Sequence, residues 1–274
     1  MVRIDTWSTN PRYKKIYREM GMRVIFSVLM LLVFAGQTVA ATLEEDVNRY
    51  IQIFKGNPGS HVAAAETFAW MGISDTRVFD LIEQRLLQVG SAMPGDRGDK
   101  DLTAWYIHAL GFSGQQKYVP TISTFLTSKT YERYAREDLA RLPLYQKWNP
   151  VISNRATFNP QYSDDVNRIL NMLRSDDFSL KRLGAKRVYF QDKDEVLLDQ
   201  LEKEVRANYT RVGSDTGDQI AWMIKALASS NKDKYLPLFQ EALVGAKDPT
   251  VNRYAKKAVD DYGRMASQKN TSKR

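Results

Sequence analysis

The chain has 274 residues, no cysteine and only two histidines, His61 and His108. This composition excludes a disulfide framework and a thiolate metal site, and it leaves few candidates for a histidine-dependent catalytic triad. Of the formal net charge of +8, residues 1–40 carry +4 and residues 269–274 carry +3, so the body of the chain keeps only +1. We therefore expect no nucleic-acid partner, no metal and no cofactor.

The first element in chain order is an apolar run over residues 24–35, which is preceded by Arg23 and followed by small residues. A helix of this length spans about 18 Å, well short of the ~30 Å hydrocarbon core of a membrane. We therefore predict a signal peptide over residues 1–40, cleaved after Ala40 or Ala41, and export, most simply to a bacterial periplasm.

The alternatives for this run are an uncleaved membrane anchor and a buried core helix. The polar residues 1–19 are long for the start of a signal peptide. Either that region is unusual, or translation starts at Met20 or Met22; we favour the second interpretation.

Apolar residues with a helical period mark the following elements. One predicted helix carries them at i, i+3, i+4, i+7 and i+8, on a single face. These residues are Leu102, Trp105, Tyr106, Ala109 and Leu110. The corresponding helix of the second copy has a similar apolar face, formed by Ala221, Trp222, Ile224, Ala226 and Leu227. Turns are predicted at residues 113–114 and 229–231, and Pro120 and Pro237 suit the first turn of the next helix.

Further helices are predicted over residues 130–142 and 250–262, the second with Asp248 as its N-cap. Strand-like alternation is not evident, so we predict an all-α chain. Residues 143–163 are predicted to form an ordered connection, because their prolines exclude a long helix and their aromatic residues favour packing. Residues 263–274 are predicted to be a polar basic tail without fixed structure.

A long internal repeat organises these helices. The stretch from Asp101 to Pro120 recurs from Asp218 to Pro237, 117 residues later, with ten of twenty positions identical. Residues 46–49 recur at an offset of 119, and residues 133–136 match at an offset of 120. Two copies of one two-pair unit are thus predicted, over residues 41–142 and 164–262, and a shorter period of about 35 residues is typical of stacked helix pairs.

The pattern A-W-x-x-K-A-L-x-x-S-x-x-x-K-Y-x-P over residues 221–237, followed by R-Y-A-K-K-A over residues 253–258, resembles bacterial HEAT-repeat proteins. Asp75 lies where such repeats often carry an acidic turn residue. The resemblance covers residues 44–262. It implies a right-handed α-solenoid of HEAT-like helix pairs with a curved surface for other macromolecules, and it implies no catalytic residue.

The duplicated lysine–tyrosine and arginine–tyrosine pairs supply the candidate partner-binding residues, since tyrosine and arginine often carry binding energy. They are Lys117, Tyr118, Arg133, Tyr134, Lys234, Tyr235, Arg253 and Tyr254. The alternative is that the tyrosines pack at the corners between helices, with lysine as a solvated neighbour. His108 is predicted to be exposed on the polar side of its helix, with proton transfer as the alternative role.

These observations predict an exported HEAT-repeat scaffold or adaptor that binds an unidentified protein partner in the cell envelope and has no catalysis of its own. One alternative is an enzyme, or the accessory subunit of an enzyme, on a HEAT-like fold. The other is a membrane-anchored envelope protein, which touches the membrane only through an uncleaved N-terminal segment.

Overall fold

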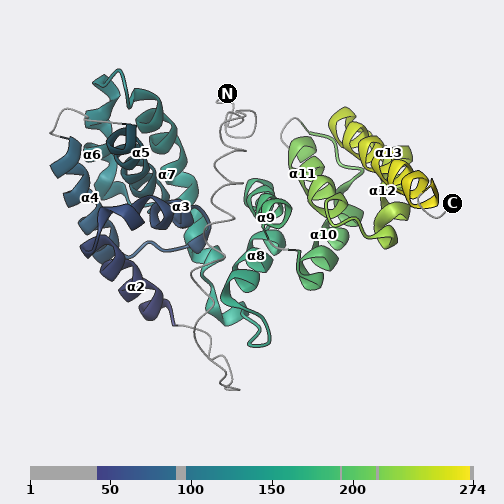
Figure 1. Cartoon of the computed structure of the whole chain (residues 1–274), viewed down its shortest axis with the longest axis horizontal. Helices are drawn as coiled ribbons and strands as arrows, with labels where there is room; N and C mark the ends of the chain where they lie inside the picture. Colours follow the sequence, from purple (N-terminus) through teal and green to yellow (C-terminus); the bar gives the residue numbers. More distant parts are fainter. Residues whose placement is uncertain (1–41, 91–96, 192, 214–215, 272–274) are drawn as a thin grey trace. The chain divides into compact units, whose positions relative to one another are not determined.

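The computed structural model describes residues 42–90, 97–191, 193–213 and 216–271 (Figure 1). Regular structure in these residues is helical throughout, without a strand, which confirms the predicted all-α class. The predicted signal peptide and its alternatives lie outside the described residues. Within those residues, no helix is both long enough and apolar enough to cross a membrane.

Twelve α-helices lie in the described part of the chain (Figure 1). They are α2 (Leu43–Lys55), α3 (His61–Met71), α4 (Thr76–Gly90), α5 (Arg97–Phe112), α6 (Val119–Thr124), α7 (Glu132–Ile152), α8 (Asp164–Arg174), α9 (Phe178–Phe190), α10 (Glu195–Asn208), α11 (Thr216–Ala228), α12 (Leu236–Gly245) and α13 (Pro249–Thr271). Short 3₁₀ helices join some of them, namely η2 (Pro58–Ser60), η3 (Gln116–Tyr118), η4 (Phe125–Thr127), η5 (Arg155–Thr157) and η6 (Asp233–Tyr235).

Local side-chain chemistry sets several helix starts and turns. The Asp248 carboxylate accepts a hydrogen bond from the Thr250 amide at 2.8 Å, which confirms the predicted cap of α13. Asp75 accepts one from the Arg77 amide at 2.9 Å, at the start of α4. The predicted turns after α5 and α11 contain Gly114 at φ 67° and Asn231 at φ 55°, the left-handed conformation that these two residue types adopt most readily.

The helices contact one another in two series. In one series α5 packs against both α3 and α7, and α11 packs against both α9 and α13. In the other, α2 packs against α4, and α10 packs against both α8 and α12. Consecutive helices join the two series, as α4 and α5, α8 and α9, and α12 and α13 do. Helix α8 also contacts α3 and α7, so the first and second halves of the described chain meet there.

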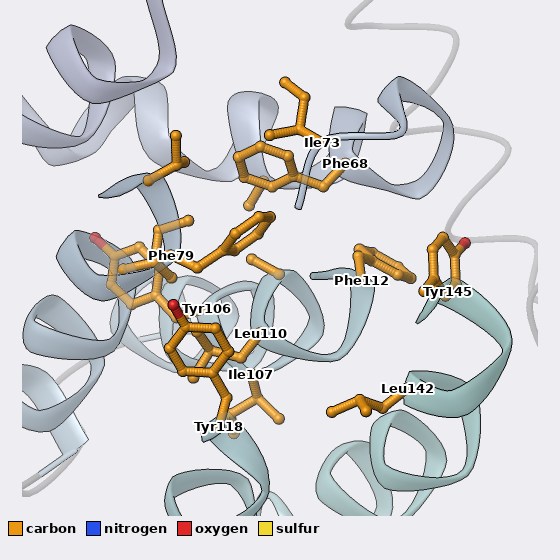
Figure 2. Packing of buried hydrophobic residues seen from close by; sticks show 14 of the residues in the cluster. Phe68, Ile73, Phe79, Tyr106, Ile107, Leu110, Phe112, Tyr118, Leu142 and Tyr145 are labelled. Atoms are coloured by element: carbon orange, nitrogen blue, oxygen red, sulfur yellow. The ribbon is translucent and has the colours of Figure 1, made fainter. Parts of the chain in front are cut away.

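Buried apolar side chains form two clusters, one mainly from residues 47–152 and one from residues 166–262. Figure 2 shows part of the first cluster, in which Phe79 lies between Phe68 and Tyr118, with ring centroids 4.8 and 6.2 Å away. Full burial of one such side chain stabilises the fold by about 1.5–3 kcal/mol. Met172 and Leu180 extend the first cluster beyond the junction between the halves.

The expectation that prolines end the helix near residue 143 is wrong, because α7 continues to Ile152 with Pro143 and Pro150 inside it. Each proline removes one backbone donor, at a cost of about 3 kcal/mol in a helix interior. Packing outweighs this cost: both prolines are exposed, while Tyr145 and Trp148 between them are buried. Only the end of the predicted connection, from residue 153 to residue 163, lies outside α-helices.

The C-terminal tail also differs from its prediction, because α13 includes residues 263–271. The partly buried Met265 packs against the second cluster, and the arginine, alanine, glutamine and lysine residues around it favour helix. In the first half, the helix after Pro120 is short: α6 ends at Thr124 and continues only as η4.

Candidate binding surface

The first predicted lysine–tyrosine pair belongs to a corner between helices. Tyr118 is fully buried, and its hydroxyl donates to the Asp80 carboxylate at 2.6 Å. The exposed Lys117 ammonium lies 2.6 Å from the same carboxylate. Partial burial alone would raise the pKa of Asp80, but the bonds from Lys117 and Tyr118 lower it below its usual value. At this corner, the Asp80 carboxylate thus binds both the buried tyrosine and the exposed lysine.

The second pair occupies the matching corner. Tyr235 is fully buried, and Lys234 lies 3.2 Å from Asp199. Lys232 and Lys234 both pair with Glu195. The Tyr235 hydroxyl bonds no carboxylate among the described residues; its polar neighbour is the Lys234 ammonium, which is the main difference from the first corner. In both corners the tyrosine packs inside, as in the packing alternative for these residues.

The arginine–tyrosine pairs lie elsewhere, on α7 and α13. The exposed Arg133 pairs with Glu137 at 2.9 Å, and Tyr134 is half-buried, with its ring 5.2 Å from that of His108. Arg253 lies over the ring of Tyr254 at 5.2 Å. Each pair has its own local contacts, so the eight predicted residues do not share one set of partners.

His108 is buried, with 2% of its surface exposed, so the prediction of an exposed polar position is wrong. Its Nδ1 donates to the Asp138 carboxylate at 2.6 Å, and Arg141 donates to the other oxygen of that carboxylate at 3.1 Å. The ring also lies 5.2 Å from Trp105. Burial is tolerated because the polar atoms of the pair satisfy each other.

The second histidine is part of the first core. His61 Nε2 donates to the Ile53 carbonyl at 2.9 Å, so its Nδ1 accepts from the Tyr106 hydroxyl at 2.5 Å. Burial lowers the pKa of His61 and raises that of Tyr106 to about 12. Both groups therefore stay neutral near pH 7, as a buried structural pair requires.

A cluster of cations on aromatic rings lies on α9 and α11. Lys225 Nζ is 3.9 Å from the centroid of a Trp222 ring and 4.5 Å from that of Tyr189. Lys186 lies 4.8 Å from Trp222, and Phe190 is 60% exposed beside these rings. We call this set the α9–α11 surface; its members are the exposed Phe190, the half-buried Arg182, Lys186, Tyr189 and Lys225, and the buried Trp222 beneath them.

Two contacts tie α9 to its neighbours. Arg182 lies 5.9 Å from Trp222 and pairs with Asp218 of α11 at 2.7 Å. Arg187 lies 3.8 Å over the ring of Trp70, which belongs to α3 in the first half. Planar guanidinium groups stack well on aromatic faces. The α9–α11 surface is therefore supported from both sides by ordered arginine side chains.

A buried ionic network joins the halves at another point. The carboxylate of Asp46 in α2 accepts from Arg49 at 2.8 Å, from Arg155 at 2.9 Å and from Arg168 of α8. Asp46 and Arg168 are both nearly inaccessible to solvent. They belong to the two copies of the repeated Asp-Val-Asn-Arg motif, residues 46–49 and 165–168, so one copy of the motif binds the other.

Histidine, aspartate and glutamate side chains within the described ranges do not gather in a group of three or more that would hold a metal ion. The chain matches no protein-family model, no curated protein and no solved structure. The sequence analysis missed the α9–α11 surface, although one signal was present: α9 has four cations and no acidic residue.

Proposed function

We propose that this chain is an exported scaffold or adaptor that binds a protein partner in the cell envelope through the α9–α11 surface. Its fold would be a right-handed solenoid of HEAT-like helix pairs, formed by duplication of a two-pair unit. The observation that carries the binding role is the stacking of Lys186 and Lys225 on Trp222 beside the exposed Phe190. Aromatic side chains and arginine, rather than lysine, most often dominate binding energy, so the exposed Phe190 is the expected anchor and the two lysines supply charge beside it.

Matched local geometry supports the duplication. Gly114 and Asn231 stand 117 residues apart in the repeat, and both have positive φ. Asp80 with Lys117, and Asp199 with Lys234, form equivalent ion pairs at the two corners. The two alternating series of helix contacts are what stacked helix pairs produce, because each pair buries a face of its neighbour.

The binding role is tested by affinity capture from envelope extract with wild-type protein and three variants. Phe190→Ala and Lys225→Glu alter the proposed surface, whereas Val244→Ala alters another exposed apolar residue, on α12. We expect a partner that wild type and V244A retain and that F190A and K225E lose. Equal retention by all four proteins, or no specific partner, would contradict the proposal.

Export is tested separately by fractionation and mass spectrometry of the native chain. An N-terminus at Ala41 or Thr42 in the envelope fraction is the expected result. An intact residue 24–35 segment in the membrane fraction would favour the anchored alternative, and recovery of the chain from the cytoplasm would overturn export.

A further inference from the structure

We draw no further inference here: the strongest candidate, the buried side-chain cluster of Lys181, Gln200 and Glu204 between α9 and α10, carries none because its lysine and its carboxylate pair with each other inside the fold.

Discussion

The two copies of the repeated unit place identical residues in different surroundings. Asp46 and Asp165 open the same four-residue motif, yet Asp46 is buried under arginines from both halves, whereas the Asp165 side chain is 55% exposed. The reason is position: α2 and α8 meet at the junction, where the first copy supplies the carboxylate and the second supplies Arg168. The structural role of the same four-residue motif is thus set by the residues that surround it in space.

A second difference involves three positions together. The first copy has His108, Gly111 and Asp138 where the second has Lys225, Ala228 and Ala258. In the first copy a Cβ on residue 111 would lie 2.6 Å from the Asp138 Cβ, so glycine leaves the room in which the aspartate meets the histidine. In the second copy, Ala228 and Ala258 take the places of the glycine and the aspartate, and Lys225 lies over aromatic rings in place of the histidine. These positions thus form a buried histidine–aspartate hydrogen bond in the first copy, whereas in the second copy they hold the charge of Lys225.

The largest expected effect concerns the two aspartates. Asp46→Ala leaves Arg168 buried without its main carboxylate, and such a loss destabilises a fold by about 3–5 kcal/mol. Asp165→Ala removes an exposed partner and should change the free energy of unfolding by about 1 kcal/mol or less. Urea unfolding of both variants measures the difference. Similar losses in the two variants would refute the asymmetry of the junction.

The glycine position gives the next effect. Gly111→Ala forces a side chain against Asp138 and should cost about 1–3 kcal/mol in thermal or urea unfolding. The reverse change in the second copy, Ala228→Gly, removes a methyl group from a helix and should cost only about 0.5–1 kcal/mol. A harmless G111A would show that α5 and α7 separate easily and that the histidine–aspartate pair does not hold them.

The corner tyrosines form a closely matched pair of tests. Tyr118→Phe removes the hydrogen bond to Asp80 and should cost about 0.5–1.5 kcal/mol. Tyr235→Phe removes a buried hydroxyl whose polar neighbour is the Lys234 ammonium rather than a carboxylate, so it should cost less than Y118F. Chemical denaturation of the two variants against wild type decides this, and a larger loss for Y235F would contradict it.

The smallest effect is a dependence on pH in the first copy. Burial lowers the pKa of His61 below its ordinary 6.5, so below that pH the unfolded chain binds a proton that the folded chain resists. Stability from this group is present above pH 6.5 and is lost as the pH falls through the folded pKa. His61→Gln should flatten the fall in melting temperature below pH 6.5. The second copy has the buried Leu180 at the matched position, which does not titrate.

Features that depend on a few neighbouring residues were predictable from the sequence. The cap at Asp248 and the turns containing Gly114 and Asn231 were identified correctly, because backbone geometry over three or four residues decides them. The all-helical class followed from the apolar period, which repeats over many turns.

Features that depend on distant contacts were not predictable in this way. The burial of His108 requires Asp138, 30 residues away on another helix. The continuation of α7 through Pro143 requires packing by side chains that local propensity ignores. The α9–α11 surface becomes visible only when α9 and α11 lie side by side, although the charge of α9 was present in its sequence.

The Asp177 carboxylate makes two kinds of hydrogen bond, one that caps α9 and one that links α9 to α7. The second bears on the order in which the chain folds. One carboxylate oxygen caps α9 by accepting from the amides of Ser179 and Leu180, while the other accepts from the indole of Trp148 at 2.8 Å. Trp148 belongs to α7 and leaves the ribosome before Asp177. The residue that holds the capping carboxylate is therefore synthesised before α9, the helix that this carboxylate caps. We therefore expect the folded first half to fix the beginning of α9, and folding to proceed from the N-terminal side toward the C-terminal side.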